Sequence, residues 1–121
     1  VGFTGHVLFD LIYTDHLWLS WALSTGALGF VFGFAIRRKS LRQGVFSEHD
    51  MIRFNVVQAV VNIAIFGLIA PTLDVLFYQH STTIVFTQGW IASIINLLTV
   101  AVFGTITLKL YANYKLKQNK Q

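Results

Sequence analysis

The chain has 121 residues, of which 55% are hydrophobic and only 12% charged, well below the quarter of charged residues usual for a soluble domain. It contains no cysteine, which excludes disulfides, thiolate metal sites and thiol nucleophiles. The net charge of +4 would suit nucleic acid, but all Lys and Arg residues lie within residues 37–53 and 109–121, beside apolar segments. They therefore indicate membrane topology and contact with the lipid bilayer, and no nucleic-acid partner is predicted.

Three stretches of the sequence are uncharged and long: residues 17–36, 54–73 and 88–108. At 1.5 Å per residue each spans roughly 30 Å, the thickness of the hydrocarbon core of a bilayer. Three crossings place both basic segments on one side of the membrane and no Lys or Arg on the other, which is the positive-inside pattern. We predict an all-α integral membrane protein with three transmembrane helices in a single transmembrane domain, residues 1–121.

The N-terminal residues 1–14 are apolar but too short to span a bilayer, and they contain Asp10. We interpret them as an interfacial segment on the non-basic side or as the end of an earlier helix. The chain does not begin with Met, so a missing targeting segment or helix is a further hypothesis.

The first predicted transmembrane helix covers about residues 15–36. Small residues recur along it at spacings of four, three and four, so they share one face: Ala22, Gly26, Gly29 and Gly33. Such a face allows another helix to approach closely within a membrane. Packing inside this chain and docking to a partner subunit are both compatible with it.

The basic loop at residues 37–47 leads into the second helix, predicted for residues 48–77. Four of its side chains are candidates for topology or lipid head-group contacts: Arg37, Arg38, Lys39 and Arg42. Ser47 and Asp50 have the spacing of a capping box, which predicts a helix start near residue 48. Pro71 lacks a backbone donor and clashes with the carbonyl four residues earlier, so a kink is predicted there.

The third helix is predicted for residues 89–110, followed by a polar tail at residues 111–121 that we expect to fray at its end. Trp and Tyr residues near both ends of the three helices are typical of the aromatic belts at membrane interfaces.

Amide side chains inside the predicted membrane segments are candidates for a hydrophilic path or for helix packing: Asn55, Gln58, Asn62 and Asn96. The first three share one face of the second helix because they are spaced by three and four residues. Counting residues from the two membrane surfaces places Asn62 and Asn96 at similar depth, so we expect them to hydrogen-bond across the helices. The same count places Gln58 level with Ala101 and Gly104.

Asp15, His16, Asp74 and His80 are expected near the non-basic surface, with Asp74 as an interfacial residue or as a partner of His80. Carboxylates and imidazoles can bind a divalent cation, but these residues lack the close helical spacing of a metal motif, and no metal site is predicted. No nucleophile elbow, phosphate-binding loop or zinc-protease motif occurs. We therefore predict no catalytic residues, no cofactor and no enzymatic activity.

A short motif follows the capping box and consists of Arg53, Phe54, Asn55, Gln58 and Ala59. It resembles the signature of the twenty-kilodalton subunit of the protein translocon at the inner chloroplast envelope (the Tic-twenty family) and of its bacterial relatives. The likeness extends loosely over residues 17–110, and its specific part covers about ten residues. Members of the plastid branch resemble four-helix proteins, whereas three spans are predicted here.

The resemblance implies a membrane subunit of a protein-import translocon that contributes helices to a polypeptide path. Its expected partners are other membrane subunits of a hetero-oligomeric complex and unfolded precursor proteins. Its expected location is the chloroplast inner envelope, with loop 37–50 and the C-terminus on the stromal side, or else a bacterial or mitochondrial inner membrane. The alternative is a structural accessory subunit that anchors or stabilises a larger respiratory or photosynthetic complex.

Overall fold

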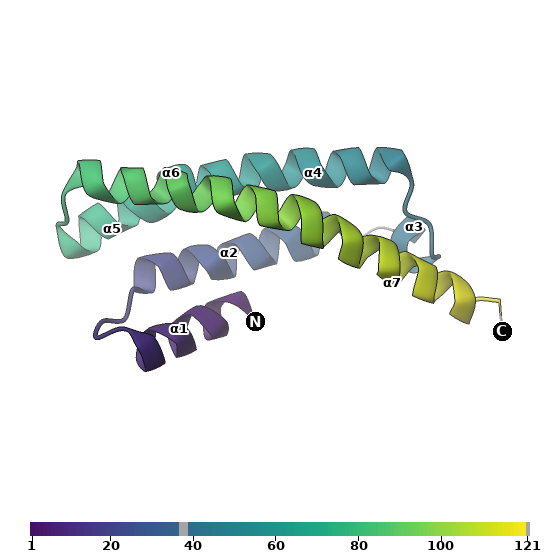
Figure 1. Cartoon of the computed structure of the whole chain (residues 1–121), viewed down its shortest axis with the longest axis horizontal. Helices are drawn as coiled ribbons and strands as arrows, with labels where there is room; N and C mark the ends of the chain where they lie inside the picture. Colours follow the sequence, from purple (N-terminus) through teal and green to yellow (C-terminus); the bar gives the residue numbers. More distant parts are fainter. Residues whose placement is uncertain (37–38, 121) are drawn as a thin grey trace.

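The computed structural model describes residues 1–36 and 39–120, and the regular secondary structure in these ranges is entirely helical (Figure 1). The all-α class predicted from the sequence is confirmed for these residues. The elements in chain order are α1 (Gly2–Tyr13), α2 (Leu19–Ala35), α3 (Lys39–Arg42), α4 (Glu48–Asn62), the π-helical η1 (Ile63–Ile69), α5 (Ala70–Tyr78), α6 (Thr82–Thr99), the π-helical η2 (Val100–Gly104) and α7 (Thr105–Gln118).

Two long helices dominate the fold. The elements α4, η1 and α5 form one continuous helix, Glu48–Tyr78, and α6, η2 and α7 form another, Thr82–Gln118. They have 31 and 37 residues and a mean hydropathy of 2.1 in their most apolar windows, so both could cross a membrane by length and composition. A third apolar helix, α2, is shorter, with 17 residues.

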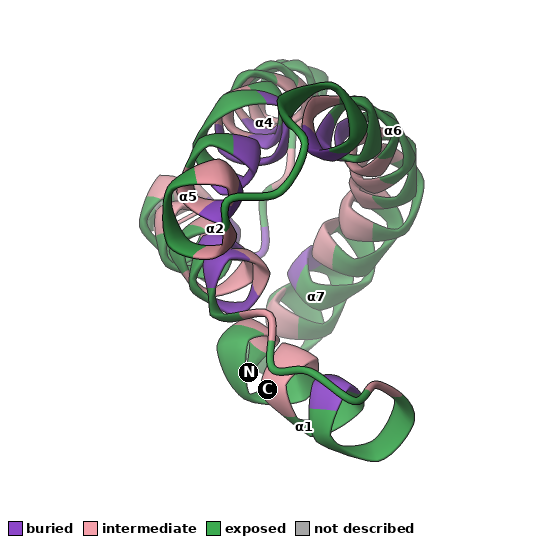
Figure 2. Ribbon diagram, turned by 90° about the vertical axis from the view of Figure 1, so that its left-hand side faces the viewer, coloured by how far each residue is buried: buried purple, intermediate pink, exposed green. Residues whose placement is uncertain are grey.

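The long helices lie side by side in opposite directions, with α2 along one side of them and α1 folded back against α2 (Figure 1). Buried positions lie on α2, α4 and α5, whereas α6 and α7 are largely exposed (Figure 2). In the most apolar part of the helix Glu48–Tyr78, 39% of the residues are buried, whereas the corresponding share in the helix Thr82–Gln118 is 6%. Helices α6 and α7 therefore present an apolar surface that this part of the chain does not cover.

The predicted start of the second helix is confirmed. The Ser47 hydroxyl accepts a hydrogen bond from the Asp50 backbone N–H at 3.2 Å, and the Asp50 carboxylate accepts one from the Ser47 backbone N–H at 3.2 Å. This reciprocal capping box satisfies two backbone donors at the N-terminus of α4.

The first predicted helix begins later than expected, at Leu19 instead of residue 15. The backbone N–H of Trp18 donates to the Asp10 carboxylate at 2.9 Å, which holds the chain in a tight connection between α1 and α2. Residues 2–13 form a helix that packs on α2, since a Cβ added at Gly26 would lie 3.1 Å from the Cβ of Phe3. Their packing in the chain was not foreseen from the sequence.

The third predicted helix is longer at both ends. It begins at Thr82 instead of residue 89, directly after Gln79 reverses the chain with a φ of 53°. It continues to Gln118, so most of the expected polar tail is helical. The tail is rich in good helix formers such as Lys, Leu and Gln. Its backbone is also packed, because a Cβ added at Gly44 would lie 2.5 Å from the Leu116 nitrogen.

The predicted kink at Pro71 takes the form of a π-helical segment that precedes the proline. The backbone N–H of Ala70 bonds to the carbonyl of Ile65, five residues back. A wider turn accommodates the proline ring without a break, and Pro71 then lies in the first turn of α5, where its missing N–H has the least effect. The distortion therefore covers Ile63–Ile69 and the helix continues through Pro71.

The closest contact between the two long helices occurs at Gly89. A Cβ added there would lie 2.4 Å from the carbonyl oxygen of Phe66 and 2.4 Å from Cγ of Pro71. Only glycine allows the backbone of α6 to rest directly on η1 and Pro71. The hydrophobic core of Ile65, Phe66 and Ala70 lies beside this contact.

We predict that Gly89→Ala lowers the free energy of unfolding by about 1–3 kcal/mol, because the added methyl group forces the helices apart. The measurement is thermal unfolding of the detergent-solubilised protein, followed by circular dichroism. Gly29→Ala is the matched control: a Cβ there has no neighbour within 4 Å, so the helix preference of Ala should leave stability unchanged or raise it by up to ~1 kcal/mol. Equal stability of the two variants would contradict the close contact.

Candidate functional site

A buried carboxylate, Asp74, organises the end of the bundle that lacks basic residues. Asp74 is only 1% exposed. Its Oδ1 accepts a hydrogen bond from the Ser20 hydroxyl at 2.9 Å, and its Oδ2 lies 3.3 Å from Nδ1 of His80. The hydroxyl of Ser24, one turn along α2, donates to the Ser20 carbonyl at 2.7 Å. These contacts join α2, α5 and the turn before α6.

Three aromatic rings pack together around His80, the residue that contacts this carboxylate. The Trp18 ring centroid lies 5.8 Å from that of Tyr78 and 5.3 Å from that of His80, and the Tyr78 and His80 rings stack at 5.7 Å. The Tyr78 hydroxyl donates to the Leu17 carbonyl and accepts from the Leu19 backbone N–H, both at 3.1 Å. Tyr78 is therefore fixed to the start of α2 by hydrogen bonds.

A cavity of about 180 Å³ opens beside Asp74. Its lining combines an acceptor, aromatic rings and apolar side chains: Trp18, Asp74, His80, Ser81, Ile84, Val85 and Gln88. Apolar and aromatic walls with a few placed polar groups are typical of small-molecule sites. This cavity is the candidate ligand site.

Asp15, His16, Asp74 and His80 were expected near one surface, and the structure brings Asp74 and His80 together, which was one of the two roles expected of Asp74. Ser20 was missed, although a Ser pair spaced by four residues in an apolar helix is a detectable signal.

The predicted amide residues lie deeper in the bundle and bridge the long helices. The Asn55 amide donates to the Thr105 hydroxyl at 3.0 Å, and the Gln58 amide donates to the Leu97 carbonyl at 3.2 Å. The Gln58 side chain reaches Leu97, about one turn from the expected Ala101, whereas the Asn55–Thr105 bond keeps this part of the helix near the expected depth. These contacts favour helix packing as the role of the amides.

Asn62 pairs within its own helix. Its amide donates to the Gln58 side-chain oxygen at 3.0 Å and to the Gln58 carbonyl at 2.9 Å. Among the described residues no hydrogen bond joins Asn62 to Asn96, so that expectation was wrong. The reason is that Gln58 lies one turn away on the same face, where it reaches Asn62 first.

The small-residue face of α2 is divided by α1. Ala22 is fully buried, and Gly26 packs against Phe3 of α1. Gly29 and Gly33 are open, with no atom within 4 Å of an added Cβ. The half of this face with Ala22 and Gly26 therefore packs within the chain, and the half with Gly29 and Gly33 is open to a contact from outside the chain.

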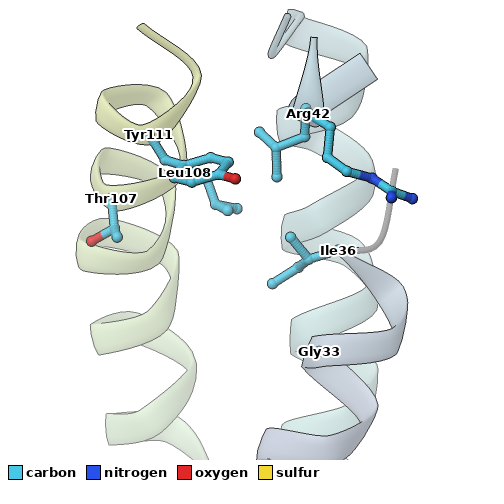
Figure 3. A pocket seen from close by; sticks show the side chains of 7 residues that line it. Gly33, Ile36, Arg42, Thr107, Leu108 and Tyr111 are labelled. Carbon is cyan, nitrogen blue, oxygen red and sulfur yellow. The ribbon is translucent and has the colours of Figure 1, made fainter. Parts of the chain in front are cut away.

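A second cavity of about 470 Å³ lies at the basic end, between α2 and α3 on one side and α7 on the other (Figure 3). Its walls are largely apolar: Gly33, Ile36, Leu41, Arg42, Thr107, Leu108 and Tyr111. The Arg42 guanidinium points away from α7 (Figure 3). Lys39 also belongs to α3, whereas Arg37 and Arg38 lie outside the described residues. Arg42, Thr107 and Tyr111 are its polar lining residues, and unlike the Asp74 cavity it has no carboxylate or imidazole in its wall.

The fold and its buried polar sites define an all-helical protein with apolar helices of membrane length. The profile of the family "ECF-type riboflavin transporter, S component" matches residues 1–113, and the chain belongs to this family.

Bacterial relatives agree over nearly the whole chain. The UPF0397 protein of Lactococcus lactis subsp. cremoris (strain NZ9000) is 45% identical over 117 residues, 97% of this chain and 64% of the relative. The UPF0397 protein of Enterococcus faecalis (strain V583) is 42% identical over 118 residues, which are 98% of this chain and 64% of the relative. The UPF0397 protein of Staphylococcus aureus (strain JH9) is 38% identical over 117 residues, which are 97% of this chain and 64% of the relative. The chain thus spans slightly less than two thirds of these relatives, and no solved structure matches it.

The family corrects the function inferred from the short motif. The resemblance of Arg53, Phe54, Asn55, Gln58 and Ala59 to the chloroplast translocon was misleading, because the match over residues 1–113 is to a transporter component. The expected role in protein import, the precursor proteins as partners and the chloroplast envelope as location are not supported. The alternative role, an accessory subunit of a respiratory or photosynthetic complex, is not supported either, because the family is one of transporter components. The prediction that the chain is not an enzyme is confirmed by the family.

We predict that Gln58 and Asn62 are energetically coupled. A double-mutant cycle with Gln58→Leu and Asn62→Leu, measured by unfolding in detergent, should give a coupling of about 0.6 kcal/mol. The matched pair Asn62→Leu and Asn96→Leu, which the structure does not join, should be closer to additive. Stronger coupling in the second pair would contradict the hydrogen bonds described here.

Proposed function

We propose that this chain forms part of the membrane-embedded, substrate-binding S component of an ECF-type transporter. The observation that carries the proposal is the family match over residues 1–113. The buried polar site at Asp74 supports it, because the cavity beside Asp74 suits a small molecule and is too small for a polypeptide.

We propose that α2 and the two long helices cross a bacterial plasma membrane as a single domain, residues 1–121. The contact between Gly44 and Leu116 supports a common side for the basic loop and the C-terminal tail. The bonds of Tyr78 to Leu17 and Leu19 join the other two connections at the opposite end. The positive-inside rule then assigns the basic end to the cytoplasm and the Asp74 cavity to the outer side.

This topology predicts the labelling of single cysteines by an impermeant thiol reagent in intact cells. Ser81→Cys should be labelled from outside, whereas Ser40→Cys and Gln118→Cys should react only after the membrane is opened. Labelling of Ser81 and Gln118 from the same side would contradict three crossings.

The ligand of the proposed S component is a small molecule bound in the Asp74 cavity. The family description names riboflavin, so riboflavin is the first compound to test. The deeper amides Asn55, Gln58, Asn62 and Asn96 are proposed as packing groups, of which Asn55 and Gln58 join the two long helices and Asn62 supports Gln58.

The partners of the proposed S component are the other transporter subunits, a membrane subunit and an ATPase. We propose that the open half of the small-residue face, Gly29 and Gly33, packs against a neighbouring transmembrane helix. A glycine has a helix-propensity cost of about 1 kcal/mol relative to Ala, so two open glycines on one stripe suit a close helix crossing. Lys39 and Arg42 then face anionic lipid head groups at the cytoplasmic surface.

Purification of the tagged full-length protein from its native membrane tests this assignment. The ATPase and the membrane subunit should co-purify with the wild type, and Gly29→Leu should reduce their recovery severalfold while leaving insertion intact. Gly5→Leu is the matched control, because a Cβ at Gly5 also has no neighbour within 4 Å. Recovery of the wild type without any ATPase would contradict the transporter assignment, and normal assembly of Gly29→Leu would exclude the docking face.

A further inference from the structure

Two buried polar atoms in the middle of the bundle have no hydrogen-bond partner in the described part of the chain: Oδ1 of Asn62 and Oγ of Ser93. Asn62 is fully buried and Ser93 is only 1% exposed. Oδ1 of Asn55 is also unpaired, but that residue borders an open groove. A buried hydroxyl or carbonyl without a partner is costly between apolar helices, so Asn62 and Ser93 require one.

The register of the two long helices places Asn62 and Ser93 opposite each other. The Gln58 amide donates to the Leu97 carbonyl at 3.2 Å. Four residues further along each of these antiparallel helices, in opposite directions, lie Asn62 and Ser93. Another four residues on is Gly89, where the two helices approach most closely. Asn62 and Ser93 therefore lie at one level, between two contacts of the same interface.

The Ser93 side chain faces this interface. Within the described residues, α6 packs only on the first long helix and on its own continuation η2. Ser93 is a buried residue of α6, so the first long helix is what covers it.

The Ser93 hydroxyl also differs from other hydroxyls of the helices. Four of these donate to the carbonyl four residues back, at 2.7–2.8 Å: Ser24, Thr25, Thr72 and Thr87. Such a bond satisfies the hydroxyl inside its own helix. Ser93 makes no such bond, so its hydroxyl is available to a partner at the interface.

The hydrogen bonds around Asn62 form a chain in which one link is open. The Leu97 carbonyl accepts from the Gln58 amide, and the Gln58 side-chain oxygen accepts from the Asn62 amide at 3.0 Å. Oδ1 of Asn62 is the next acceptor and Ser93 lies opposite, but the two atoms do not bond to each other. Two facing polar groups without a direct bond are commonly bridged by water.

We infer that one buried water molecule bridges Oδ1 of Asn62 and the Ser93 hydroxyl between the two long helices. The water donates to the Asn62 oxygen, which can only accept, and accepts from the Ser93 hydroxyl. The bridge completes a circuit that leaves α6 at Leu97 and returns to it at Ser93. It lies directly before η1 and fixes the register where the π-helical segment begins. The site shares no lining residue with the Asp74 cavity and is independent of the proposed ligand and partners.

Thermal unfolding of the purified full-length protein in detergent tests the bridge. Ser93→Ala should lower the melting temperature by about 2–4 °C, because the water and the Asn62 oxygen lose a partner. In the Asn62→Leu background the same substitution should not lower it. Ser24→Ala is the matched control, a buried serine whose hydroxyl bonds to its own helix, and it should leave the melting temperature unchanged.

Two results of this experiment would overturn the inference. An unchanged or raised melting temperature of Ser93→Ala would show that the hydroxyl has no partner on the facing helix, because a buried unpaired group is removed without loss. An equal decrease with and without Asn62→Leu would show that Ser93 acts through another residue.

Nuclear magnetic resonance separates a bridging water from a direct hydrogen bond and needs only the wild type and Ser93→Ala. In protein with isotope-labelled asparagine, magnetisation should pass from water to the Asn62 side-chain amide, and Ser93→Ala should abolish this transfer. Absence of transfer in the wild type, together with destabilisation by Ser93→Ala, would indicate a direct bond and overturn the water. Transfer that persists in Ser93→Ala would overturn the role of Ser93 as its second partner.

Discussion

The close approach of α6 to the first long helix at Gly89 is the constraint on which the rest of the structure depends. Because the α6 backbone rests on Phe66 and Pro71, the two long helices are held at one distance and one register. That register brings Gln58 to the Leu97 carbonyl deeper in the bundle. Toward the end that lacks basic residues, it places the first turns of α6 opposite Asp74 and so forms one wall of the cavity.

The polar groups of the bundle serve two different purposes. The amides near the middle donate to partners on the same or the facing helix, which satisfies their donors where bulk water is absent. At the end that lacks basic residues, Asp74 instead contacts Ser20 and His80 beside a cavity. The amide donors therefore stabilise the fold, although Oδ1 of Asn55 and Oδ1 of Asn62 are buried without a hydrogen-bond partner. A carboxyl group beside a cavity is suited to binding.

Local signals in the sequence were sufficient for several features. The capping box at Ser47 and Asp50 gave the start of α4, and uninterrupted apolar stretches gave the long helices. The contact at Gly89 and the pairing of Ser20 with Asp74 could not be predicted, because they join residues that are distant in the chain and depend on helix register. The register itself depends on the π-helical segment before Pro71, whose extra residue per turn leaves no clear sequence signal.

The misleading family resemblance has a physical origin. A basic residue, an aromatic residue and amides at helical spacing, such as Arg53, Phe54 and Gln58, suit any membrane helix that enters from a basic surface. Such a motif indicates only that the helix lies in a membrane environment, whereas the match over residues 1–113 indicates common ancestry with the family.

The central claim is that Asp74 holds the ligand of a transporter component. The most direct measurement is mass spectrometry of the small molecules that co-purify with the full-length protein and are released on denaturation. The account predicts one small molecule released by the wild type and by Asp15→Asn, and absent from Asp74→Asn. Release of the same compound in equal amount from all three proteins would contradict it.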